Sequence, residues 1–155
     1  MDTQPSFLKS LRILFTGLLL GQIFFLAIVL ILFATGVLEP VKSGSRGNIF
    51  MFMSFAISVF AIPMSYRIFN VKLEEAKQQN SFDEKTNAYR GAFIIQLALC
   101  EGPAIFALIS YLLTANNLLL LLIGLLLLNF LMLYPLKSKI AQQLALDDNE
   151  ESMLD

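Results

Sequence analysis

The chain has 155 residues, of which 57% are hydrophobic and only 15% are charged, with a formal net charge of -1. A soluble domain carries about 25% charged residues, so this composition is typical of an integral membrane protein. With one cysteine and no histidine, the sequence gives no support for a disulfide framework, a zinc site or Ser/His/Asp or Cys/His catalysis, and no basic arm suggests nucleic-acid binding.

The first apolar span covers residues 11–36 and follows two basic residues. Its apolar run far exceeds the roughly 7–15 residues of a signal-peptide core, and no small-x-small cleavage pattern follows it. We therefore predict an uncleaved membrane helix. Gly17 and Gly21 form a GxxxG pair, a spacing that lets helix backbones approach closely. Gln22 lies in the middle of this span.

An external loop, residues 37–48, is predicted to connect this helix to a second span at residues 49–67. Small residues recur along the second span at spacings of four, three and four, which keeps them on one helix face: Ser54, Ser58, Ala61 and Ser65. We expect this face to pack against another helix. Ser58 is the polar residue nearest the middle of the span.

The segment 71–89 is charged and helix-favouring, so the second helix should extend into the cytoplasm until Asn80. Ser81 and Glu84 have the spacing of a capping box, with Ser81 as the N-cap. The third helix should therefore begin in the cytoplasm and enter the membrane near Gly91.

Glu101 is the only acidic or basic residue in the third span, residues 91–114. It lies about 15 Å from either end of the span. A charge at that depth costs roughly 2.5–3.5 kcal/mol or more, so desolvation favours the neutral acid. Pro103 should kink the helix, and Gly102 leaves space beside the acid. Ala98 and Gly102 form a second pair of small residues for helix packing.

A turn at Asn116 and Asn117 precedes the fourth predicted span, residues 118–136, which carries Asn129. Residues 1–146 are expected to form a single four-helix transmembrane domain. Residues 147–155 form an acidic tail with too few apolar residues to fold alone.

The distribution of basic residues predicts the orientation. Nine Lys and Arg residues flank one side of the predicted spans, namely Lys9, Arg12, Arg67, Lys72, Lys77, Lys85, Arg90, Lys137 and Lys139, against Lys42 and Arg46 on the other. Because basic residues concentrate in cytoplasmic segments, both termini should be cytoplasmic. The predicted fold is all-α: a four-helix transmembrane bundle, N-in and C-in, in a bacterial inner membrane.

Each predicted helix carries one hydrogen-bonding side chain near the bilayer midplane: Gln22, Ser58, Glu101 and Asn129. Unpaired polar groups are costly in hydrocarbon, so these four should meet inside the bundle. Two interpretations of Glu101 remain open. The carboxyl either gains and loses a proton as part of a transport cycle, or it stays protonated and donates a structural hydrogen bond to Gln22 or Asn129. Ser58 and Asn129 taken alone are typical of helix packing.

The third span carries a family resemblance in residues 92–113, AFIIQLALCEGPAIFALISYLL. This run resembles the carboxylate-bearing helix of the proteolipid c subunits of rotary ATPases, in which a mid-helix acid precedes a run like AIFALI. The resemblance implies that Glu101 is an ion-carrying acid. The second span differs from the family's glycine-rich inner helix, since it has no glycine and four phenylalanines, and the Arg-Gln-Pro loop signature is absent. We therefore do not expect a c ring.

Two functions follow as hypotheses. The first is proton or cation movement through the protonatable Glu101, by the chain alone or as a homo-oligomer. The second is a non-transporting accessory or assembly role, in which small-residue faces and the cytoplasmic loop bind a larger membrane protein. An enzyme is not expected, because one buried acid is a poor catalytic set. No cofactor or metal is implied, and the expected surroundings are the lipid bilayer.

Overall fold

The structure is a computed structural model that describes residues 6–38 and 45–154, and the described residues form six helices and no strand. The helices are α1 (Phe7–Ala34), α2 (Ser45–Lys77), α3 (Phe82–Thr114), α4 (Asn117–Leu131), α5 (Lys137–Leu144) and α6 (Asp148–Ser152). Among the described residues, α1, α2 and α3 are long and apolar enough to cross a membrane. The predicted all-α class is therefore confirmed, and the three long apolar helices fit a membrane helical bundle.

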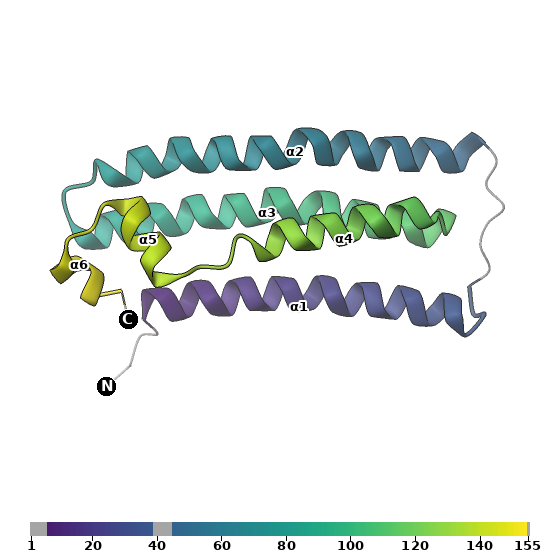
Figure 1. Cartoon of the computed structure of the whole chain (residues 1–155), viewed down its shortest axis with the longest axis horizontal. Coiled ribbons are helices and arrows are strands. Elements are labelled where there is room, and N and C mark those ends of the chain that lie inside the picture. The colour runs from purple at the N-terminus through teal and green to yellow at the C-terminus, as the bar shows by residue number, and fades with distance from the viewer. Residues whose placement is uncertain (1–5, 39–44, 155) are drawn as a thin grey trace.

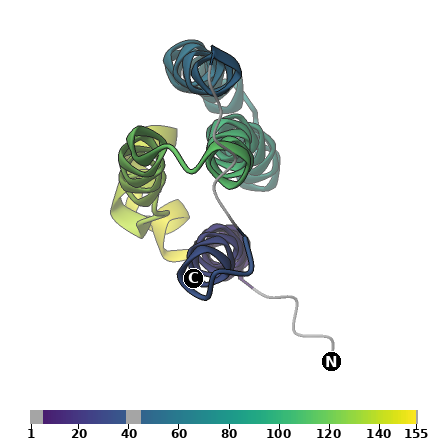
Figure 2. The same ribbon diagram turned by 90° about the vertical axis from the view of Figure 1, so that its right-hand side faces the viewer.

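Helix α3 is the central helix of the molecule. Figure 2 shows α1 and α2 on opposite sides of α3, with α4 against a third side. Half of the most apolar window of α3 is buried inside the chain, against 11% of the α1 window and 17% of the α2 window. The arrangement is thus three helices around α3, and the outer faces of α1 and α2 are left for lipid.

The helix boundaries at both ends of α3 follow the predicted capping signals. The Ser81 hydroxyl accepts a hydrogen bond from the backbone N–H of Glu84 at 3.3 Å and caps α3. On the opposite side, Ala115 adopts a left-handed conformation with φ 49° and ends α3, and the Asn116 side chain caps α4 by accepting from the N–H of Leu118 at 3.0 Å. Helix α2 begins at Ser45, within the predicted external loop, and residues 39–44 of that loop lie outside the described residues.

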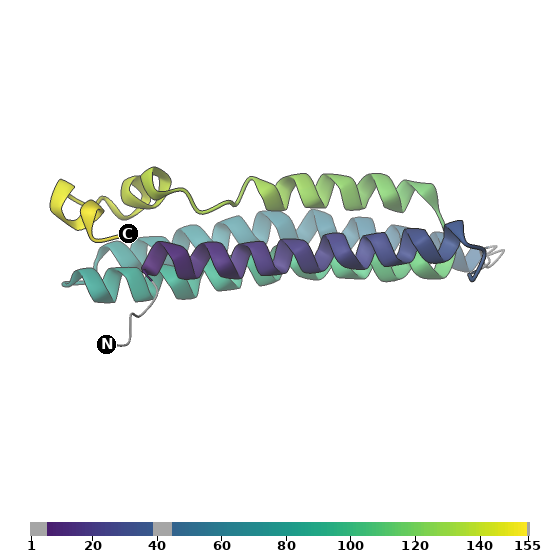
Figure 3. The same ribbon diagram turned by 90° about the horizontal axis from the view of Figure 1, so that it is seen from below.

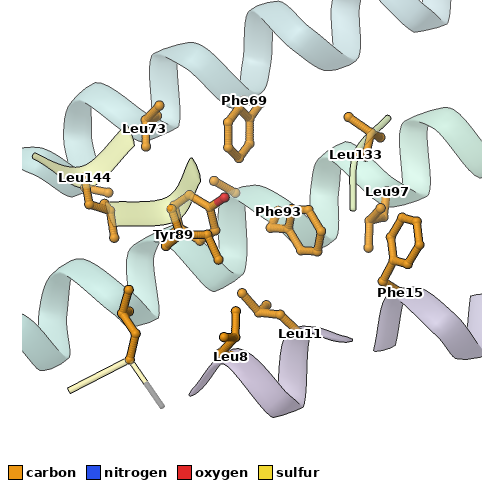
Figure 4. Packing of buried hydrophobic residues seen from close by; sticks show 14 of the residues in the cluster. Leu8, Leu11, Phe15, Phe69, Leu73, Tyr89, Phe93, Leu97, Leu133 and Leu144 are labelled. Carbon is orange, nitrogen blue, oxygen red and sulfur yellow. The ribbon is translucent and has the colours of Figure 1, made fainter. Parts of the chain in front are cut away.

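Two apolar clusters hold the helices together, one toward each end. In the first, Phe15 of α1 stacks on Phe130 of α4 with ring centroids 5.1 Å apart, and Tyr89 lies 5.6 Å from Phe69 of α2. Figure 4 shows Phe69, Tyr89, Phe93, Leu97 and Phe15 converging from three helices. The second cluster lies toward the α1–α2 connection and contains Val29, Ala104, Ala107, Leu108, Tyr111, Leu119, Leu122, Ile123 and Leu126.

The predicted fourth span requires a correction, because the helix ends at Leu131 and not at Leu136. Pro135 explains the early end: it has no N–H to donate to the carbonyl of Leu131, and its ring disfavours helical backbone at the preceding residue. A 15-residue helix is about 22 Å long, shorter than the roughly 30 Å hydrocarbon layer. The apolar stretch 132–136 therefore continues as irregular backbone.

Two basic side chains satisfy backbone carbonyls in this irregular stretch. The Arg12 Nε donates to the carbonyl of Pro135 at 3.5 Å, and the Lys139 Nζ donates to the carbonyl of Met132 at 3.2 Å. Because unpaired carbonyls are costly near hydrocarbon, these bonds let the chain leave its helix here.

The acidic tail folds against the helices and does not stand alone. The Asp147 and Glu150 side chains form a capping box for α6, and Leu154 is fully buried. Two contacts attach the tail to the body: Lys85 pairs with Glu150 at 3.0 Å, and the Leu8 N–H donates to the carbonyl of Leu154 at 3.3 Å. Figure 3 shows α5 and α6 at the same end of the molecule as the start of α1. The helical body thus supplies the apolar contacts that the tail lacks.

Candidate functional site

The register of α1 against α3 brings Gln22 to the level of Glu101. The two helices run in the same direction (Figure 1), and two aromatic contacts fix their register: Phe7 with Tyr89 at 6.2 Å and Phe33 with Tyr111 at 5.5 Å. These pairs are 82 and 78 positions apart in sequence. Gln22, between them on α1, therefore lies level with residues 100–104 of α3.

Gln22 is buried without hydrogen-bond partners. Its side chain is 3% exposed, and neither its amide nitrogen nor its amide oxygen has a partner among the described residues. Leaving a buried polar group unpaired costs about 1–3 kcal/mol. Gln22 is therefore an unsatisfied donor and acceptor inside the helical body.

Glu101 lies on the flank of α3 that faces α1. Leu97 and Leu108 share its helix stripe, since they are four residues before it and seven after it. Both leucines pack in clusters that include residues of α1 and α4. Arg90, eleven residues before Glu101 on the same stripe, places its guanidinium 5.6 Å from the centre of the Phe7 ring of α1. Glu101 itself is partly exposed, at the edge of the buried face, and makes no hydrogen bond or ion pair with the described part of the chain.

A polar network that joins α2, α3 and α4 lies beside this level. The Ser65 Oγ and Cys100 Sγ are 3.2 Å apart, and the Asn129 Nδ2 donates to the same sulfur at 3.8 Å. The Tyr66 hydroxyl donates to the Asn129 Oδ1 at 3.0 Å. Cys100 is buried, as expected, but it is a hydrogen-bonding group of this network, which sequence reasoning missed. The serine at one end and the tyrosine at the other belong to the same turn of α2.

The small-residue face of α2 packs on α3 through hydroxyl contacts. The Ser54 Oγ donates to the Ser110 Oγ at 3.0 Å, whereas the Ser58 Oγ donates to the carbonyl of Ser54 at 2.7 Å within its own helix. Ala61 is half-buried on the same face. Ser58 is therefore satisfied locally and is not bonded to Glu101.

The remaining small residues lie on open faces. Gly17 and Gly21 on α1 and Gly102 on α3 have no other atom within 4 Å of the position that a Cβ would take, and Ala98 is exposed. Pro103 is buried, and α3 continues through it as an unbroken helix. These glycines are thus not used in contacts between the described helices.

The four predicted midplane groups divide into two pairs. Ser58 and Asn129 have hydrogen-bond partners, whereas Gln22 and Glu101 have none in residues 6–38 and 45–154. The same part of the chain contains no cluster of three His, Cys, Asp or Glu side chains that could hold a metal ion. A carboxyl and an amide at one level offer oxygen atoms and a donor, a combination suited to a proton, a water molecule or a small cation.

Comparison of the chain with protein-family models, with curated protein sequences and with solved structures found no match. The resemblance of residues 92–113 to a proteolipid helix therefore depends on the sequence motif alone.

Proposed function

We propose that this chain is a multi-pass membrane protein in which Glu101 holds and moves a proton or a small cation. The observation that carries the proposal is the pair of unsatisfied groups at one level: the Gln22 amide on α1 and the Glu101 carboxyl on the facing flank of α3. An unsatisfied amide at that depth is costly, and it gains most from a ligand that supplies its missing hydrogen bonds.

The pair has a chemical division of labour. Glu101 is the group that changes charge, because it binds a proton when neutral and binds a cation when ionised. The Gln22 amide would offer its carbonyl oxygen to the ligand and an N–H to the carboxylate. These two groups position the ligand and the carboxylate, and the amide itself does not change charge. Glu101 is partly exposed at the edge of α3, so its carboxyl is not sealed inside the helical body.

Ion flux in reconstituted vesicles tests this function. Under an imposed membrane potential, the native protein should move protons, sodium or potassium, and the Glu101→Gln variant should show no flux above that of empty vesicles. Glu75→Gln is the matched control, because Glu75 is an exposed carboxylate near the end of α2 and should leave flux unchanged. Absence of flux in the native protein, or full flux in the Glu101→Gln variant, sinks the proposal.

The orientation that accompanies this function is N-in and C-in. The start of α1, the end of α6 and the α2–α3 turn lie at one end of the molecule (Figure 1), the end that also holds Arg12, Lys85 and Lys139. This distribution supports a cytoplasmic location for that end. A cysteine introduced at the exposed Val37, with Cys100 replaced by Ala, should react with a membrane-impermeant reagent added outside the cell; protection from it argues for the reverse orientation.

A second candidate function is binding to a larger membrane protein. It is favoured by the small residues on open faces, because Ala98 and Gly102 flank Glu101 with free space that a partner helix could enter. Replacing Gly102 with Leu should then abolish co-purification of a defined partner from native membranes while the helical content is kept. Isolation of the native chain as a lone monomer in mild detergent argues against this candidate.

A further inference from the structure

A cavity of about 110 Å³ lies at the cytoplasmic end, away from Glu101 and Gln22. It is bounded by α2, by the first half of α3, and by the irregular stretch that follows α4 together with α5. Since a water molecule occupies about 30 Å³ of liquid, the cavity has room for roughly three to four waters or one small polar group. The early end of α4 at Leu131 creates this space, because the chain then crosses α2 and α3 as irregular backbone.

Polar side chains line the cavity although it is set among apolar clusters. Gln96 on α3 is 3% exposed and lines the cavity, and its amide has no hydrogen-bond partner among the described residues. Asn70 on α2 also lines it, and its amide is likewise unpaired in that part of the chain. Asn70 is exposed, whereas Gln96 is buried as a residue, so its unpaired amide can bind a ligand or water only in the space that it borders.

The lining is rich in donors and contains one charge. Lys139 has three N–H donors and uses one on the carbonyl of Met132, so two remain. Gln143 accepts from the Tyr89 hydroxyl through Oε1 at 2.8 Å, which leaves its amide nitrogen as a donor. No Asp or Glu lines the cavity in the described residues. The charge and the free donors therefore favour an anion over a cation.

We propose that this cavity binds a phosphate group, either as free phosphate or as the headgroup of a membrane phospholipid. The donors come from three directions, with Asn70 on α2, Gln96 on α3, and Lys139 and Gln143 on α5. A tetrahedral oxyanion accepts hydrogen bonds from several sides, and lysine is a common phosphate ligand. Basic pockets between helices on the cytoplasmic side of a membrane suit such headgroups. The site is independent of the Glu101 proposal.

Thermal unfolding of the detergent-purified protein, titrated with inorganic phosphate against sodium chloride of equal ionic strength, tests the free-phosphate form. The native Tm should rise to saturation with phosphate only. Lys139→Gln should require about tenfold more phosphate or more, since it removes a charge-assisted hydrogen bond. Gln96→Leu should also weaken the rise of Tm with phosphate. This variant replaces Lys139→Gln in the test if Lys139→Gln fails to fold. Lys72→Gln, a cytoplasmic-end lysine outside the cavity lining, is the matched control and should respond like the native protein.

A lipid comparison separates the two sources of phosphate. If a phospholipid is the ligand, phosphatidylglycerol should raise the Tm above the value in galactosyl diacylglycerol, which lacks phosphate. This difference in Tm should shrink in the Lys139→Gln and Gln96→Leu variants. It should not shrink in Lys72→Gln. A response to free phosphate with the same dependence identifies a soluble ligand. If neither phosphate nor phospholipid produces a shift that depends on Lys139 or Gln96, the proposed site does not exist.

Discussion

Gln22 and Asn129 are two amides near the middle of the molecule with opposite surroundings. The Gln22 amide is buried and unpaired, whereas Asn129 accepts from Tyr66 and donates to Cys100. An amide has the same donors and acceptors in both residues, so the difference arises from the neighbouring helices alone. The two residues therefore provide an internal comparison of unsatisfied and satisfied polar groups.

Replacing each amide with leucine should change stability in opposite directions. Gln22→Leu removes an unpaired polar group at similar volume and should stabilise the protein by about 1–3 kcal/mol. Asn129→Leu leaves the Tyr66 hydroxyl without its acceptor and should destabilise it by a similar amount, about 1–3 kcal/mol. Denaturant unfolding in detergent micelles measures both. Loss of stability in Gln22→Leu would mean that Gln22 has partners outside the described contacts.

The sequence allowed the depth of these residues to be predicted but not their partners. Helix rise and span length are enough to place Gln22 and Glu101 at similar depth. The partners depend on how each helix is rotated about its axis, and the apolar residues around these spans are too uniform to fix that rotation. Cys100 illustrates the difficulty, because a cysteine in an apolar run reads as a small hydrophobic residue until the serine and asparagine beside it are known.

At the level of the elements, local capping signals were the most reliable guide. Ser81 and the Asn116 turn predicted where α3 begins and ends, because a cap depends only on residues three or four positions away. The predicted end of α4 was wrong, although Pro135 lies inside the apolar run and signals that a helix ends nearby. Hydropathy measures only apolar content, so it extended the span past the residue at which the helix has to stop.

The tail is an element that the sequence did not predict. The six consecutive polar or charged residues at 147–152 suggest a solvated segment, yet α6 is capped by Asp147 and Glu150 and is followed by a buried leucine. The contacts that order it join residues far apart in sequence: Lys85 and Glu150 are 65 positions apart, and Leu8 and Leu154 are 146 positions apart. Such long-range contacts have no local signature.

Leu154 should be the residue that holds the tail in place. Leu154→Ala removes a fully buried side chain and should weaken tail docking by about 2–5 kcal/mol. Amide hydrogen exchange over residues 147–154 should then accelerate, while exchange in α3 stays unchanged. The neighbouring Met153 is 60% exposed, so Met153→Ala is the control and should leave exchange in the tail as it is. Equal acceleration in both variants contradicts this role for Leu154.

At the scale of the whole molecule, the class of protein was predictable and the arrangement of helices was not. Composition alone predicts a membrane protein, and three helices long and apolar enough to cross a membrane support that prediction. The central position of α3 could not be predicted from the sequence. All the long helices are apolar on most of their faces, so the sequence does not indicate which helix the others surround. That position gives the Glu101-bearing helix contacts with α1, α2 and α4 (Figure 2).

Infrared spectroscopy of the protein in lipid bilayers tests the central claim, that Glu101 exchanges a proton, most directly. At neutral pH the native spectrum should contain the carbonyl band of a neutral carboxylic acid that is absent from Glu101→Gln, and the band should shift rapidly after transfer to deuterated buffer. Such exchange requires that the carboxyl releases its proton to solvent. A Glu101 band that does not shift, or the absence of any Glu101-dependent carboxylic acid band in buffer free of sodium and potassium, would contradict the account.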